Sequence, residues 1–545
     1  MASTLVAPTE SSQSSRAVDL DRPAHPIARL VFAGLVVACF AYAGVSVFRD
    51  TQQVGEQLAT GVFLFLGLAL LIALGFEFVN GFHDTANAVA TVIYTNSMPA
   101  NLAVMWSGFF NFLGVMLSSG AVAYSIVTLL PLDLILNVGS GAGFAMIFAL
   151  LLAAVMWNLA TWYVGLPNSS SHTLIGSVLG VGLANQLLHR GPGGTAGVDW
   201  SQATKVLTGL WMAPLIGFGA AMLMLVTLRA VARNPVLMQA PEGDAPPPRG
   251  IRALLVFTCT AVSFSHGSND GQKGMGLIML ILIGCAPTAY ALNRTLPASE
   301  TPAFYASATA ASRVLASNGA AAVPLERARA VLVDAVSRRT VTSPAAYGAA
   351  IALSRDVSRR VASYGSLDRV PASATPNLRN DMYLVLDATR MIAKEPTKAG
   401  LSEAEADRLK DYQARLEAGT RYIPLWVKVA VALALGLGTM VGWKRIVVTV
   451  GEKIGKQHMT YGMGASAELV AAATILAADR FGLPVSTTHI LSSGVAGASV
   501  ASGMGLQRRT LVQLAAAWLM TLPVAMLLSG ALYWLLLQLV EGGAF

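Results

Sequence analysis

Charge and cysteine are both scarce in this sequence. Only 12% of the 545 residues are Asp, Glu, Lys or Arg, which is about half the share of a soluble domain. By contrast, 54% are hydrophobic, and the mean hydropathy is +0.58. The low charge excludes a wholly soluble protein, because most of the chain needs an apolar solvent. The three cysteines, Cys39, Cys259 and Cys285, lie in or beside apolar segments, and their odd number favours neither a disulfide framework nor a metal cluster.

The first 27 residues also lack the pattern of a removable signal peptide, so the first apolar segment is expected to be a retained span. Stretches of membrane length, about 20 helical residues each, recur along the chain. We expect spans at about 30–48, 59–79, 101–130, 143–164, 206–229, 251–264, 271–292, 423–443, 463–478 and 511–537. Two stretches rich in Gly and Ser, 170–188 and 487–504, could be re-entrant. The predicted fold class is an all-α polytopic protein with about nine to twelve segments in the lipid bilayer.

The formal charge of +8 does not indicate a nucleic-acid partner here. Lys and Arg gather in short loops between apolar segments, which predicts that the loops at 230–250 and 444–462 are cytoplasmic. If the 251–292 region crosses the membrane once, the long polar stretch after it lies on the opposite, periplasmic side.

Two short motifs occur twice. Residues 165–172 read Gly-Leu-Pro-Asn-Ser-Ser-Ser-His, and residues 482–489 read Gly-Leu-Pro-Val-Ser-Thr-Thr-His. A weaker match aligns 80–87, which read Asn-Gly-Phe-His-Asp-Thr-Ala-Asn, with 266–273, which read His-Gly-Ser-Asn-Asp-Gly-Gln-Lys. The sequence therefore predicts one unit used twice, with inverted repeats as the pattern typical of secondary carriers.

Spacing supports the duplication once one insertion is removed. Asp84 precedes His172 by 88 positions, and Asp270 precedes His489 by 219; without the 129 residues of the polar stretch 294–422, the second spacing is 90. That stretch is predicted to be a hydrophilic helical insertion. The expected organisation is a polar tail (1–29), a first repeat with an extra N-terminal span (30–230), a cytoplasmic loop (231–250), the start of the second repeat (251–293), the insertion (294–422) and the rest of the second repeat (423–545).

Each Ser/Thr-His motif indicates the start of a half-helix. Pro presets the backbone before a helix, and hydroxyl residues cap it, so each start offers unpaired N–H donors at the positive end of the helix dipole. Two such starts facing each other would hold a tetrahedral oxyanion, although Ser-rich starts also serve as simple caps. The predicted oxyanion ligands are Ser169, Ser170, Ser171, Ser486, Thr487 and Thr488.

The other repeated motif gives a polar stripe inside an apolar helix. Glu77, Asn80, Asp84, Asn87 and Thr91 step by three or four residues, and Ser263, His266, Asp270 and Lys273 do the same. An ionised Asp in the bilayer costs about 2.5–3.5 kcal/mol or more, so it needs a partner or a function. Coupling of a cation or proton is the functional interpretation, and a structural hydrogen-bonded pair is the alternative. Five further residues could also carry protons, with a structural role favoured for each: Glu77, His83, His172, Glu468 and His489.

These residues resemble the PiT family of inorganic phosphate transporters, especially its bacterial low-affinity members. The resemblance rests on the 80–90 and 264–274 segments, both Ser/Thr-His motifs and the Gly-Glu-Lys-Ile-Gly-Lys run at 451–456, and it extends over about 70–290 and 420–535. It implies an inverted-repeat fold in a bacterial inner membrane, often a homodimer, with phosphate between the two half-helices and the coupling cation at the Asp residues. It also implies transport of a neutral metal hydrogen phosphate with a proton.

One departure from the sodium-coupled relatives favours protons. Those relatives tend to carry Asn-Asp-x-Ala-Asn-Ala in both halves, whereas here His83 precedes the first Asp and Lys273 replaces the second Asn. A fixed ammonium there could take the place of bound sodium. The coupling residues are expected to be Asp84, Asn87, Asn269, Asp270, Lys273 and Glu77, with Asp84 and Asp270 as candidate metal ligands.

The sequence therefore predicts a symporter, not an enzyme, that imports inorganic phosphate, with protons as the driving ion and Mg²⁺, Ca²⁺ or Zn²⁺ as the accompanying metal. Three alternatives stay open: a sodium-coupled phosphate or sulfate carrier of the same fold, an intramembrane hydrolase that uses Asp84 and Asp270 as acid and base, and a receptor whose insertion binds a partner.

Overall fold

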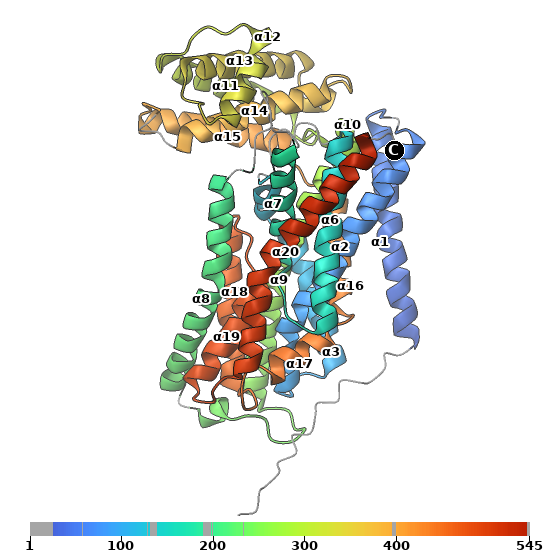
Figure 1. Ribbon diagram of the computed structural model, residues 1–545, viewed down its shortest axis with the longest axis vertical. Coiled ribbons are helices and arrows are strands. Elements are labelled where there is room, and N and C mark those ends of the chain that lie inside the picture. Colours follow the sequence, from blue (N-terminus) through green and yellow to red (C-terminus); the bar gives the residue numbers. More distant parts are fainter. Residues whose placement is uncertain are drawn as a thin grey trace, which may run out of the picture.

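The computed structural model describes residues 26–56, 58–127, 129–130, 139–188, 198, 200–232, 234–394 and 399–541, without the side chains of 84–87, 201–202 and 541. The described chain is helical and contains no strand beyond an isolated bridge between Gly455 and Leu506. The all-α polytopic class is confirmed. Figure 1 shows a bundle of long helices with a separate layer of shorter helices, α11–α15, at one end and α17 near the other.

The helices of the bundle follow the predicted halves. The first half contains α1 (Pro26–Gln53), α2 (Thr60–Tyr94), α3 (Ala100–Leu117), α4 (Ala121–Val127), α6 (Gly141–Val164), α7 (Ser170–Leu188) and α8 (Trp200–Ala232). The second half contains α9 (Arg249–Cys285), α10 (Pro287–Tyr290), α16 (Leu425–Thr439), α17 (Lys444–Glu452), α18 (Tyr461–Arg480), α19 (Thr487–Ala501) and α20 (Arg508–Glu541). A short 3-10 turn, η1 (Pro235–Met238), lies between the halves.

Seven of the described helices are long and apolar enough to cross a membrane, or eight if a bent pair is counted as one span. The predicted number was higher because it included helices that this criterion leaves out. The half-helix α19 has 15 residues, about 22 Å at 1.5 Å per residue, and is shorter than the hydrocarbon layer. Helix α9 is long enough, but its polar stripe lowers its hydropathy.

Two expected boundaries differ from the structure. The predicted spans 251–264 and 271–292 form one helix, α9, of 37 residues. The polar residues between them are buried against other helices, so they do not interrupt the helix. The predicted span 101–130 is divided instead, because α3 ends at Leu117 and Gly120 turns the chain with φ +85° before α4.

Glycines bring the two halves into close reciprocal contact. A Cβ added at Gly81 of α2 would lie 2.2 Å from the Leu435 oxygen of α16, and one added at Gly267 of α9 would lie 2.1 Å from the Asn111 oxygen of α3. Helix α7 likewise packs on α20, and α19 packs on α8. Each half therefore contributes the packing surface for the other half, as a duplicated unit predicts; the inverted orientation of the repeats stays a prediction.

The layer at the end of the bundle falls inside the stretch predicted as an insertion. It contains α11 (Thr301–Ser317), α12 (Leu325–Ser337), α13 (Pro344–Tyr364), α14 (Thr375–Lys394) and α15 (Glu403–Thr420), with the turns η2 (Ala298–Glu300) and η3 (Leu367–Arg369). Its entry and exit are tied together, because the Asn293 amide N–H donates to the Gly419 oxygen at 2.8 Å and the Asn293 side chain donates to the Ala418 oxygen at 2.9 Å.

Candidate functional site

The two Ser/Thr-His motifs form matching helix starts. The Ser169 hydroxyl accepts from the His172 amide at 3.1 Å, and the Ser486 hydroxyl accepts from the His489 amide at the same distance. Both serines are buried. The first hydroxyl of each motif is therefore the helix cap, and the motif residues after it lie in the first turn of α7 or α19.

These two helix starts, called the tips below, meet inside the bundle. The rings of His172 and His489 lie 4.5 Å apart between centroids, and the Ser171 hydroxyl donates to the Val485 oxygen at 2.7 Å. Trp518 of α20 stacks on His489 at 4.2 Å and donates to the Pro167 oxygen at 3.2 Å. The tips thus come from opposite halves of the chain and are held at one place.

Helix α9 carries polar residues to both tips. The Asn269 side chain donates to the Leu483 oxygen at 3.1 Å and accepts from the Val485 amide at 3.4 Å, which fixes the chain just before the second tip. On the first tip, the Ser170 hydroxyl donates to an Asp270 oxygen at 3.3 Å, and the Lys273 ammonium donates to the Ser171 hydroxyl.

A charged pair lies directly beside the tips. The Lys273 ammonium is 2.7 Å from an Asp270 carboxylate oxygen, and both side chains are 0% exposed. His266 extends the chain of contacts, with one ring nitrogen 3.5 Å from Asp270 and the other 2.7 Å from the Asn111 side-chain oxygen. Since burial strengthens electrostatic interactions, the pair places a strong local field at the tips without a large net charge.

One hydroxyl at the tips lacks a hydrogen-bond partner in the described chain. The Thr487 hydroxyl is buried and has no hydrogen-bond partner among the described residues. A buried hydroxyl without a partner costs free energy, so a bound oxyanion would relieve that cost. Thr487 therefore presents a donor without a described partner on the second tip, whereas the Ser170 hydroxyl on the first tip donates to Asp270, and Ser169 and Ser486 cap their helices. Thr488, the last predicted ligand, is also fully buried.

The matching stripe on α2 is only partly described. The side chains of Asp84 and Asn87 lie outside the described residues, although the α2 backbone passes through both positions without a break. Glu77 and Asn80 are fully buried, and Glu77 packs directly against Gly274 of α9. Glu77 of α2 thus contacts the residue that follows Lys273 in α9. The role of Asp84 stays a prediction.

Two carboxylates outside the repeated motifs also bind hydroxyl groups in the bundle: Glu468, which the sequence already suggested as a possible proton carrier, is fully buried, and Asp479 is half-buried. Glu468 of α18 accepts from the Thr258 hydroxyl at 2.5 Å and from the Thr91 hydroxyl. Asp479 accepts from the Ser268 hydroxyl at 2.7 Å and from the Gln272 amide at 2.5 Å. An acidic residue in an otherwise apolar segment was the available sequence signal, but its partners come from helices far away in the chain.

Among the described residues, no group of three or more His, Cys, Asp or Glu side chains could hold a metal ion.

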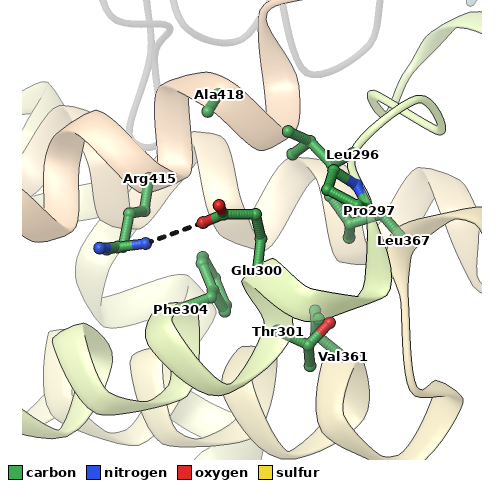
Figure 2. A pocket seen from close by; sticks show the side chains of 9 residues that line it. All are labelled: Leu296, Pro297, Glu300, Thr301, Phe304, Val361, Leu367, Arg415 and Ala418. Atoms are coloured by element: carbon green, nitrogen blue, oxygen red, sulfur yellow. Dashed lines mark hydrogen bonds and ion pairs between the residues drawn. The ribbon is translucent and has the colours of Figure 1, made fainter.

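A pocket in the α11–α15 layer is a different kind of site. Figure 2 shows it lined by the apolar side chains of Phe304, Val361 and Leu367. Its charged rim is the ion pair between Arg415 and Glu300 at 3.2 Å. The one hydroxyl among its lining side chains, that of Thr301, donates to the Gly365 oxygen at 3.0 Å. The tips therefore remain the candidate site.

Comparison with known proteins decides the family. A sequence model described as "Phosphate transporter family" matches residues 80–529. The chain belongs to this family. The family consists of transporters, and the described chain has several helices that could cross a membrane. Both findings agree with the predicted multi-pass location in the inner membrane and with a role other than catalysis.

Several relatives match along most of this chain. The "Low-affinity inorganic phosphate transporter PitA" of Escherichia coli K12 is 43% identical over 520 residues, covering 88% of this chain and 99% of that protein. PitB of the same organism is 41% identical over 500 residues, covering 89% and 99%. A solved structure titled "The sodium-dependent phosphate transporter" aligns with a TM-score of 0.47 and 19% identity, covering 87% of this chain and 99% of that chain.

Proposed function

We propose that this protein imports inorganic phosphate by symport, accompanied by a divalent metal ion and driven by protons. The observation that carries the proposal is the meeting of the two tips, one from each half, beside the buried pair Asp270–Lys273. Helix N-termini and hydroxyls suit a tetrahedral oxyanion, and relatives in both the PitA and PitB groups are named as phosphate transporters.

Phosphate would bind between the tips. Thr487 is the most directly supported donor, because its hydroxyl has no other partner in the described chain. The Ser170 hydroxyl donates to Asp270 in this structure and would turn to the anion when phosphate binds. Ser169, Ser171, Ser486 and Thr488 complete the set by capping or bridging the tips. Alternating access follows from the reciprocal packing, since movement of one half against the other would open the tips to one side at a time.

Lys273 supports protons rather than sodium as the coupling ion. Its ammonium already contacts a carboxylate oxygen of Asp270 and donates to the Ser171 hydroxyl of the first tip. A sodium ion at that place would therefore be repelled by a fixed positive charge. Protons would instead exchange on Glu77 and Asp270, whose side chains are buried, and on Asp84. Asn87 and Asn269 would orient these groups.

The metal is proposed as cargo. Moving a dianion into a negatively charged interior costs about 4.6 kcal/mol per 100 mV, and pairing with Mg²⁺, Ca²⁺ or Zn²⁺ removes that cost. Asp84 and Asp270 are the candidate carboxylates for contact with the metal. A homodimer is proposed from the family resemblance alone.

The coupling can be tested with purified protein in sealed vesicles. An inward pH gradient with a divalent metal should drive accumulation of radiolabelled phosphate without sodium, and excess sulfate should not compete. A collapse of the pH gradient should abolish the accumulation. Uptake that requires a sodium gradient and ignores pH would identify sodium as the coupling ion, and release of product by unsealed protein would indicate an enzyme.

A further inference from the structure

Arginines gather where the α11–α15 layer joins the bundle. The carboxylate of Glu417 is shared by Arg390 of α14 and Arg421, the latter at 3.2 Å. The Arg390 and Arg421 side chains are 24% and 19% exposed, so both are partly buried but still reach solvent. A single carboxylate cannot neutralise both guanidinium groups, and Arg–oxyanion pairing is strongest in such partly desolvated places.

Two tyrosines complete this group. The Arg379 guanidinium lies 5.0 Å from the centroid of the Tyr383 ring, and the Arg421 guanidinium lies 5.0 Å from that of Tyr124. Burial raises the pKa of Tyr383, and the positive charges of Arg421, Arg379 and Arg390 oppose that rise while Asp387 adds to it. The root cluster, defined as Arg379, Arg390, Arg421, Tyr124 and Tyr383 with the carboxylates Glu417 and Asp387, thus carries a net charge of +1.

One donor of the root cluster lacks a hydrogen-bond partner in the described chain. The Tyr124 hydroxyl is buried and has no hydrogen-bond partner among the described residues. Phenol and guanidinium groups donate hydrogen bonds, which is what a phosphate oxygen accepts. The stacked arginine and the tyrosine hydroxyl therefore offer both charge and donors.

Helix α4 links the root cluster to the segment that leads into the second tip. Tyr124 lies on α4 one turn after Ala121, and a Cβ added at Gly482 would lie 3.4 Å from Ala121. Gly482 begins the motif that ends in Thr487 and His489. Helix α4 is also fixed to α9, because the Val122 amide donates to the Gln272 side chain at 2.9 Å, next to Lys273. Short helix α4 thus connects the root cluster with the site between the tips.

We propose that the root cluster is an outer binding site that collects inorganic phosphate at the mouth of the pathway before the anion reaches the tips. This inference rests on the proposed function. The layer lies at the end of the bundle opposite α17 (Figure 1), and the loop containing α17 is predicted to be cytoplasmic. The root cluster therefore faces the side from which an importer takes its substrate, and its positive field raises the local anion concentration.

The test measures phosphate uptake into vesicles by wild type, Arg390→Gln and Arg421→Gln at ionic strengths of about 0.01 M and 0.3 M. At low salt the Debye length is about 30 Å, and removal of one positive charge near an arriving dianion should raise KM about three- to fivefold. Vmax should stay the same, and the ratio of the variant's KM to the wild-type KM should approach one at high salt. Arg390→Lys should retain most of the wild-type KM.

Glu417→Gln separates collection from structural anchoring. The collecting role predicts a lower KM at low salt, because the variant removes a countercharge; an anchoring role predicts the same damage as the arginine variants. Arg338→Gln is the matched control, since Arg338 is 71% exposed and pairs with Asp334 elsewhere in the layer. An unchanged low-salt KM in Arg390→Gln, or a raised KM in Glu417→Gln, overturns the inference. Wild type that takes up no phosphate overturns the proposed function instead.

Discussion

The ion pair of Lys273 and Asp270 is the residue-scale contact on which the site depends. Both side chains are fully buried, and loss of one member of such a pair costs about 3–5 kcal/mol because it leaves the other charge without compensation. Lys273→Gln should therefore lower the unfolding temperature markedly and abolish uptake. The three buried cysteines allow this measurement in detergent, because a thiol-reactive dye labels them as the protein unfolds.

The double variant Asp270→Asn with Lys273→Gln is the control. It removes both charges together, so most of the lost stability should return while uptake stays absent. If Lys273→Gln alone keeps wild-type stability and proton-driven uptake, the pair has neither the structural nor the coupling role assigned here.

At the scale of elements, close helix pairs depend on glycines at equivalent positions of the two halves. A Cβ added at Gly180 of α7 would lie 2.1 Å from the Met526 oxygen, and one at Gly497 of α19 would lie 2.1 Å from the Phe218 oxygen. Because backbone atoms cannot move aside easily, Gly497→Val should displace α19, destabilise the protein by at least about 1–3 kcal/mol and weaken phosphate uptake.

Gly219→Val is the matched control, because a Cβ at that position of α8 has no atom within 4 Å. It should leave both unfolding temperature and uptake near wild type. Equal damage from both substitutions would mean that the effect comes from bulk in the membrane and not from the α8–α19 contact.

The elements also show what the sequence could predict. Proline followed by hydroxyls and His is a local signal, so the starts of α7 and α19 were predictable to within a residue. The continuity of α9 was not, because whether a run of polar residues breaks a helix depends on what buries it. The bonds from Asn269 to the backbone before Thr487, and from Thr91 and Thr258 to Glu468, join distant segments. Such pairings follow from the packing of helices and leave no mark in local spacing.

At the scale of the whole molecule, the α11–α15 layer can be separated from the transport machinery. The backbone at Asn293 is hydrogen-bonded to Gly419, so the two ends of the layer meet. The tips, α9 and the reciprocal glycine contacts all lie outside this layer. A variant in which a short Gly/Ser linker replaces residues 296–416 should therefore still insert into the membrane and transport phosphate.

The same deletion removes Arg379 and Arg390 from the root cluster but leaves Arg421, Tyr124 and Glu417. We expect Vmax to remain within about twofold of wild type. KM at low salt should rise about as much as in Arg390→Gln, because Asp387 is removed with the two arginines and the net charge of the root cluster falls from +1 to 0 in both variants. Uptake by vesicles containing equal amounts of each protein measures both constants. Complete loss of uptake by a correctly inserted variant would instead mean that the layer is essential for function, as expected if the insertion binds a partner. In that case the bundle alone would not transport phosphate, and the layer would not act only as a collecting site.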